Sequence, residues 1–227
     1  MAKTLKRHFE QQCGAEFEVR WYSRQDWRCA SLQSGTQLWF CRPELNVIFP
    51  SRIAYEALKE GCREFNYSAA SWRTPFHRFY LRTTLHPLFA SRVAPGVMTV
   101  CPSVAGAETM LILGGNNRLR ILNVEKERLE FILKDGFDPQ SIETEIQTRM
   151  RIKSSHVPEV LSVAADGRSF SERYIRGIAL SRIAEAKRLH WEDAAFRIVS
   201  EISSSAIEKP AEPIAYCASL AESIWGH

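Results

Sequence analysis

The stretch from Thr109 to Gly177 constrains the fold of this chain more than any other part of the sequence. It begins with two apolar segments separated by Gly114-Gly115-Asn116-Asn117, and a third apolar segment, Leu129 to Lys134, follows a charged turn. Glycine and asparagine tolerate positive φ, so this run predicts a tight hairpin turn between antiparallel strands. We therefore expect an antiparallel meander whose first turn carries little side-chain bulk.

A helix is predicted directly after this meander. Asp138-Pro139 is a strong helix start, because aspartate caps the free N–H groups and proline fits the first turn. Ile142, Ile146 and Met150 recur every four residues and predict one apolar face, with Glu145 beside it. A hairpin is then predicted from Val160 to Tyr174, because an Asp-Gly turn separates two further strand-like segments.

The first hundred residues predict a separate small α+β unit. A turn-rich stretch around residues 94–107 suggests a boundary, which divides the chain into 1–105, 106–178 and 179–227. The last part has helical periodicity. The segments expected to be regular are strands at Phe17–Trp21, Cys29–Leu32, Gln37–Cys41 and Asn46–Phe49, a helix at Arg52–Glu64, and helices at Leu180–Lys187, Trp191–Ile207 and Ile214–Trp225.

Composition places the chain among ordinary globular proteins. It has 227 residues, a net charge of +4 and six cysteines, none of them in a Cys-x-x-Cys pair. Scattered cysteines favour reduced thiols and a cytoplasmic location, and they give no zinc motif. No apolar stretch approaches the roughly 20 residues needed to cross a bilayer, so we expect no membrane segment.

Arginine and aromatic residues alternate between Trp72 and Arg82. Such a pattern can bind single-stranded nucleic acid, because bases stack on rings and guanidinium groups hold phosphates. The interpretation we favour is an aromatic core segment with arginine stems packed along its edge. The mild positive charge does not require a nucleic-acid partner.

Residues 109–180 resemble the N-terminal lobe of protein-kinase-like phosphotransferases, particularly the branch that acts on aminoglycosides and small sugars. The resemblance rests on the order of strands, on Phe131-Ile132-Leu133-Lys134 and on Glu172-Arg173-Tyr174-Ile175 before Gly177. It implies an α+β fold with a sheet of about five antiparallel strands and one helix, preceded by the first unit and followed by a few helices. It also implies ATP with Mg²⁺ as the cofactor.

The resemblance assigns roles by position. Lys134 would hold the α- and β-phosphates, Glu145 would pair with it (Glu143 being the fallback), and the turn would cover the phosphates. The hinge would read adenine through its backbone. The residues so implied are Gly114, Gly115, Asn116, Lys134, Glu145, Glu172, Arg173, Tyr174 and Ile175.

Two features depart from the family pattern. The turn is not a full Gly-x-Gly-x-x-Gly motif, and no His-x-Asp loop with a trailing Asn follows Gly177; the nearest sequence is His190-Trp191-Glu192-Asp193. We therefore expect no catalytic residue in this chain and negligible phosphoryl transfer by it alone, with a catalytic lobe lost, truncated or supplied by a protein partner. A non-catalytic scaffold is the main alternative, in which Lys134 and Glu145 are ordinary surface charges. Nucleic-acid binding through residues 72–82 is the second.

Overall fold

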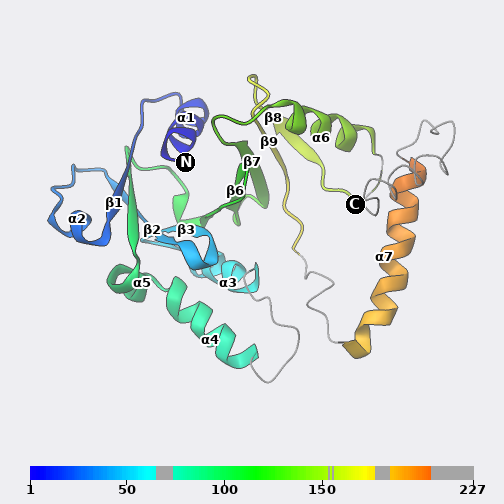
Figure 1. Ribbon diagram of the computed structural model, residues 1–227, viewed down its shortest axis with the longest axis horizontal. Helices are drawn as coiled ribbons and strands as arrows, with labels where there is room; N and C mark the ends of the chain where they lie inside the picture. Colours follow the sequence, from blue (N-terminus) through cyan, green and yellow to red (C-terminus); the bar gives the residue numbers. More distant parts are fainter. Residues whose placement is uncertain (65–73, 153, 155, 177–184, 206–227) are drawn as a thin grey trace, which may run out of the picture.

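The structure of the protein is a computed structural model, and it describes all residues except 65–73, 153, 155, 177–184 and 206–227. The described residues form one antiparallel sheet, with helices packed on both of its faces (Figure 1). The strands are β1 (Glu18–Ser23), β2 (Gln37–Arg42), β3 (Val47–Pro50), β4 (Gly96–Cys101), β5 (Met110–Leu113), β6 (Arg118–Asn123), β7 (Arg128–Leu133), β8 (Val160–Val163) and β9 (Ser169–Arg173).

The nine strands lie in the order β1-β4-β2-β3-β5-β6-β7-β9-β8. An α+β fold is thus confirmed, but the sheet among the described residues is larger than the five or so strands expected. The extra strands come from the first hundred residues, which join the meander where Ile48 of β3 pairs with Ile112 of β5. Hydrogen-bonded pairing is therefore continuous across the predicted boundary near residue 105, and the division into units stays a prediction.

Side chains along each strand alternate between the two faces of the sheet, and the described helices pack on both faces. Successive residues point to opposite faces of a sheet, so Leu111 and Ile112 of β5 enter different cores. Helix α1 covers the face of Ile112, and α3, α4 and α5 cover the face of Leu111 (Figure 1). The helices are α1 (Ala2–Cys13), α2 (Arg24–Cys29), α3 (Tyr55–Glu64), α4 (Thr74–Leu85), α5 (Pro87–Val93), α6 (Gln140–Arg151) and α7 (Glu185–Ser205), with short 3₁₀ turns at Pro43–Leu45 and Ala107–Thr109.

Helix α6 forms a third core on the Leu111 face of the sheet. Its Ile142 and Ile146 are buried against Phe131, Leu133 and Phe170 of strands β7 and β9. The Asp138 side chain accepts a hydrogen bond of 2.9 Å from the Gln140 amide at the start of α6, but Pro139 and not Asp138 occupies the cap position. The predicted apolar face is shorter than expected, because Met150 is 69% exposed.

The second half of the sheet matches the sequence prediction closely, and in the first half β1, β2 and β3 lie within two residues of the expected strands. The prediction of a strand at Cys29–Leu32 is wrong, because Cys29 ends α2 and residues 30–32 form no strand. Ser23, at the start of α2, accepts from the Asp26 amide and favours that helix. Helix α3 begins at Tyr55 rather than Arg52. Elements not predicted are α1, α2, α4, α5 and β4.

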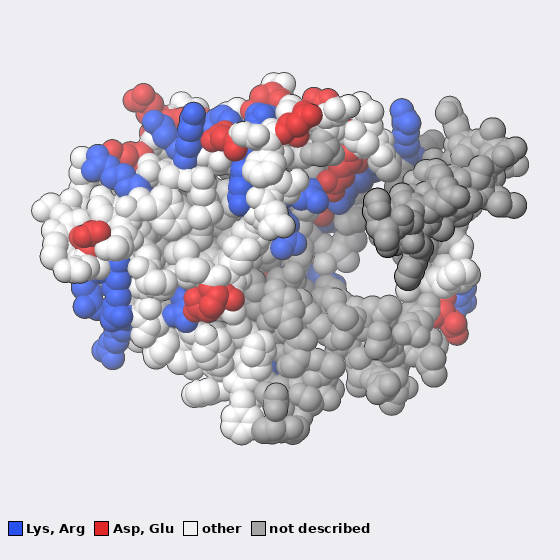
Figure 2. All heavy atoms as spheres, in the orientation of Figure 1, with Lys and Arg blue, Asp and Glu red and all other residues white. Residues whose placement is uncertain are grey.

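Charge is mixed rather than segregated on the face seen in Figure 2, where basic and acidic side chains alternate along the rim over α1 and α6. Among the cysteines whose side chains the structure describes, Cys13, Cys29, Cys41 and Cys101 are free thiols. None of the helices in the described ranges has the length and apolar character required of a bilayer-crossing segment. The helix expected at Trp191–Ile207 is present as part of α7, which begins earlier, at Glu185. The helix expected at Ile214–Trp225 lies outside the described residues, as does the start of the one expected at Leu180–Lys187.

Candidate functional site

The turn between β5 and β6 and the end of β7 meet, as the resemblance implied. Lys134 Nζ donates to the carbonyl oxygens of Gly115 at 2.5 Å and Asn116 at 3.1 Å. The backbone amide of Lys134 donates to Asn117 O at 2.9 Å, so backbone and side chain both tie this lysine to the turn. The ammonium group therefore stands at the turn, on a half-buried residue at the end of a rigid strand.

The two glycines of the turn are needed for its own packing. A Cβ on Gly114 would lie 1.9 Å from Asn46 Oδ1, and one on Gly115 would lie 2.7 Å from the Arg118 carbonyl oxygen. The Gly114 amide also donates to Asn46 O at 2.8 Å. The lack of side-chain bulk at Gly114 thus lets the turn pack against the start of β3.

Glu145 lies in an arginine network rather than beside Lys134. Its carboxylate accepts from Arg118 at 2.5 Å and from Arg149 at 2.7 Å, and Arg149 also pairs with the buried Glu172. The pair of Lys134 with Glu145 implied by the resemblance is therefore replaced by contacts with arginines. Arg118 begins β6 directly after the turn, so it links α6 to the turn in place of the lysine.

Two stacked rings form the floor of this network. Phe131 and Phe170 lie parallel with centroids 4.7 Å apart. The guanidinium of Arg149 lies 5.7 and 5.6 Å from the two centroids, and that of Arg118 lies 5.2 Å from Phe131. Burial raises the pKa of Glu172, and the neighbouring Glu145 adds to the rise while Arg149 opposes it. The network is thus a partly desolvated group of charges beneath the sheet.

Several polar groups of the hinge-like segment, residues 172–175, are hydrogen-bonded within the protein. Glu172 and Arg173 end β9, and the amides of Arg173 and Tyr174 donate to the carbonyl oxygens of Glu159 and Glu127 at 3.0 and 2.7 Å. Ile175 is exposed, and Gly177 lies outside the described residues. The amides of Arg173 and Tyr174, which the resemblance assigns to adenine recognition, therefore already donate hydrogen bonds within the protein.

Glu143, the fallback for Glu145, lies near the turn between β8 and β9. Its Oε1 would be 3.3 Å from a Cβ built on Gly167, so its side chain faces the turn between β8 and β9. The structure brings Gly115, Asn116 and Lys134 together as predicted. It places Glu145 and Glu172 together in the arginine network.

A second polar cluster, which the sequence reasoning missed, lies on the opposite face of the sheet beneath α1. His8 Nε2 lies 2.8 Å from Glu130 Oε2, and Gln12 donates to the same oxygen at 2.6 Å. Arg128 lies 3.1 Å from the other oxygen of Glu130 and donates to Ser162. These side chains border a cavity of about 160 Å³. The sequence signal was an acid inside an apolar strand, but its partner is 122 residues earlier in the chain.

The aromatic segment from Trp72 to Arg82 lies largely on the surface. Trp72 and Arg73 are outside the described residues, and the rest belongs to α4. Phe76 and Phe79 are 70% and 72% exposed, so the favoured interpretation as an aromatic core segment is wrong. The buried stripe of α4 is instead formed by Leu81 and Leu85, which pack beneath β2, β3 and β5. Two grooves of about 510 and 580 Å³ adjoin this helix.

No group of three or more metal-binding side chains gathers anywhere in the described parts of the chain. The Lys134 ammonium group thus lies against backbone carbonyl groups, and the described residues provide no carboxylate cluster near it. Comparison of the sequence with family models gave no match, and comparisons with curated proteins and with solved structures gave none either.

Proposed function

We propose that the segment 106–178 is a kinase-like nucleotide-binding lobe that binds ATP through its phosphates without transferring a phosphoryl group. The observation that carries the proposal is the position of the Lys134 ammonium, 2.5 Å from the Gly115 carbonyl oxygen on the β5–β6 turn. A lysine held at a strand end is a fixed point charge suited to a phosphate. Phosphate oxygens would compete with the two turn carbonyls for its three donors.

Strand order supports the same proposal. Strands β5, β6 and β7 are adjacent, α6 follows β7, and β9 returns next to β7 with β8 outside it. This is the order of turn, lysine strand, helix and hinge strand on which the resemblance rests. Arg118 begins β6 directly after the turn, but Glu145 and the Phe131 ring hold its guanidinium, so Lys134 alone is assigned to the phosphates in this proposal.

The residues present fit a nucleotide better than they fit a metal ion. Lys134 offers a cationic donor at the turn, whereas the described residues contain no carboxylate cluster that could bind Mg²⁺. Mg²⁺ commonly keeps several waters and binds through substrate phosphates. It therefore enters this proposal only as the counter-ion of ATP.

The test is calorimetric titration with ATP and Mg²⁺, supported by thermal unfolding. Wild-type protein should gain about 2.7 kcal/mol of stability when ATP is present at 100 times its Kd. Lys134→Ala should weaken binding about tenfold or more, which is 1.4 kcal/mol. Lys126→Ala is the matched control, because Lys126 is exposed in the β6–β7 turn. Equal affinity of wild type and Lys134→Ala, or no binding at all, would reject the proposal.

A second candidate, binding of single-stranded nucleic acid along α4, is favoured by the exposed Phe76 and Phe79 beside Arg78 and Arg82. We expect retention on a single-stranded oligonucleotide that weakens as salt rises. The double substitution Arg78→Ala and Phe79→Ala should weaken the binding free energy by about 1–3 kcal/mol, because base stacking on Phe79 is lost. Retention should fall accordingly. The control is Phe196→Ala with Arg197→Ala, an equally exposed pair on α7. Retention that ignores salt, or an equal loss in the control, counts against this candidate.

A further inference from the structure

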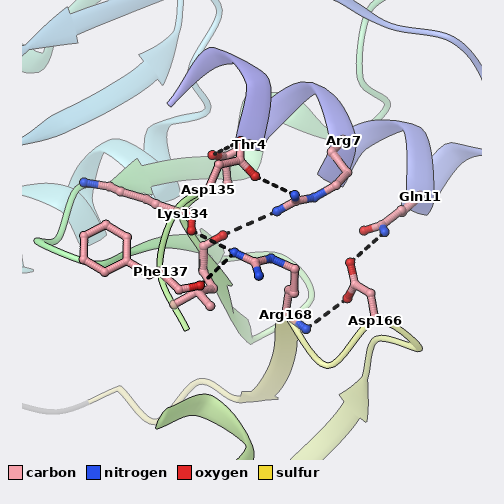
Figure 3. Close-up of polar contacts among 9 residues, drawn as sticks. Thr4, Arg7, Gln11, Lys134, Asp135, Phe137, Asp166 and Arg168 are labelled. Atoms are coloured by element: carbon pink, nitrogen blue, oxygen red, sulfur yellow. Dashed lines mark hydrogen bonds and ion pairs between the residues drawn. The ribbon is translucent and has the colours of Figure 1, made fainter. Parts of the chain in front are cut away.

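The turn that follows Lys134 is held from two directions by arginines of other elements. Figure 3 shows Arg7 of α1 pointing at Asp135 and Arg168 lying against the backbone of residues 134–137. Arg7 Nη1 donates to Asp135 Oδ1 at 2.5 Å, and Thr4 Oγ1 donates to Oδ2 of the same carboxylate at 3.3 Å. Residues 134–137 are called the lysine turn below.

Arg168 holds the backbone of the lysine turn. Its Nη2 donates to the carbonyl oxygens of Lys134 at 3.0 Å and Phe137 at 3.2 Å. The Arg168 carbonyl accepts from the Leu133 amide at 2.8 Å, which fixes the arginine to the end of β7. Arg168 therefore spans the lysine turn from its first residue to its last.

Helix α1 also fixes the loop that carries Arg168. Gln11 donates to Asp166 Oδ2 at 3.0 Å, and Asp166 Oδ1 accepts from the Arg168 amide at 3.0 Å (Figure 3). Thr4, Arg7 and Gln11 are spaced by three and four residues, so one face of α1 meets both loops. The helix itself is fixed by Leu5 and Phe9, which are almost fully buried in the core.

The lysine turn is directly hydrogen-bonded to the β5–β6 turn. The Lys134 amide donates to Asn117 O at 2.9 Å, and its ammonium group contacts Gly115 and Asn116. Asp135 is the next residue, so a movement of its Cα displaces Lys134 across a single planar peptide. The contacts of α1 therefore bear on the position of the one lysine proposed to hold phosphate.

We infer that α1 is a positioning element for nucleotide binding, in which Arg7 and Arg168 hold the lysine turn and so fix the Lys134 ammonium at the β5–β6 turn. This inference rests on the proposed function. Arg7 and Asp135 are each about one-third exposed, and an ion pair of that kind contributes little to global stability. Loss of Arg7 should consequently affect the lysine turn far more than it affects the whole fold.

The first measurement follows hydrogen exchange of single backbone amides and needs no ligand. Arg7→Ala should speed exchange of the Lys134 amide about tenfold, while the Leu122 amide in the centre of the sheet keeps its wild-type rate. Arg7→Lys should restore part of the protection, because it keeps a cation opposite Asp135. The matched control is Lys6→Ala, which removes the neighbouring cation of α1 and its 3.6 Å pair with Glu10.

The second measurement titrates the same variants with ATP and Mg²⁺. Arg7→Ala and Arg168→Ala should each weaken binding about three- to tenfold, with Arg7→Lys intermediate and Lys6→Ala unchanged. Suppose that Arg7→Ala speeds exchange of the Lys134 amide but wild-type protein binds no ATP. Arg7 would then still hold the lysine turn, but both its role in nucleotide binding and the proposed function would be rejected. Unchanged exchange and unchanged affinity in Arg7→Ala, with a wild type that binds ATP, would overturn this inference alone.

Discussion

Glu130 is the residue at which pH should act most directly on stability. Burial by itself raises the pKa of this carboxyl, but the contacts with His8, Arg128 and Gln12 outweigh burial and leave the pKa below its ordinary value. A depressed folded-state pKa gives stability that is present above the unfolded pKa of about 4.3 and is lost as pH falls through the folded value.

We therefore expect the wild-type free energy of unfolding to fall as pH is lowered from about 5, and Glu130→Gln to weaken this fall. At pH 7 the substitution should cost about 1–3 kcal/mol, because it leaves the Arg128 guanidinium without its carboxylate partner. Urea unfolding at several pH values measures both effects. Glu18→Gln, at an exposed pair with Arg20, is the control and should keep the wild-type slope. An equal slope in Glu130→Gln would contradict the assignment.

The site residues show what local pattern can and cannot predict. Lys134 and the small residues of the turn were placed together correctly, because both follow from strand order and from hairpin geometry within about twenty residues of chain. The partner of Glu145 was not predictable in the same way. The choice between Lys134 and Arg118 depends on which side chain projects toward α6, and Arg118 shares a face with Phe131 and Leu133. Arg7 and His8 lay too far away in sequence to be assigned to this lobe.

Elements in the second half of the chain were predicted well for a physical reason. Their turns carry strong signals, such as Gly-Gly-Asn-Asn, Asp-Pro and Asp-Gly, and their strands pair with sequence neighbours. In the first half, β4 lies between β1 and β2, so its partners are remote in sequence. Its turn-rich ends, around Pro95 and Pro102, concealed the strand.

Helices that were missed have weak local signals and rely on tertiary contacts. Helix α1 has no acidic residue in its first turn and no side-chain cap, and it is held by Leu5 and Phe9 in the core. Helix α4 begins just before a proline and exposes its aromatic residues, so its pattern did not mark a buried stripe. Burial of Leu81 and Leu85 against the sheet overrides that pattern, as tertiary context commonly does.

At the scale of the molecule, the β3–β5 pairing should make both halves of the sheet unfold together. Leu133 is fully buried against α6, and Leu133→Ala should cost about 2–5 kcal/mol. Residues 106–178 contain no tryptophan, so tryptophan fluorescence follows the rest of the chain and circular dichroism follows all of it. We expect the substitution to shift the urea midpoint equally by both methods, with Leu161→Ala on edge strand β8 as the exposed control. A fluorescence midpoint unmoved by Leu133→Ala would show that residues 1–105 unfold independently of residues 106–178.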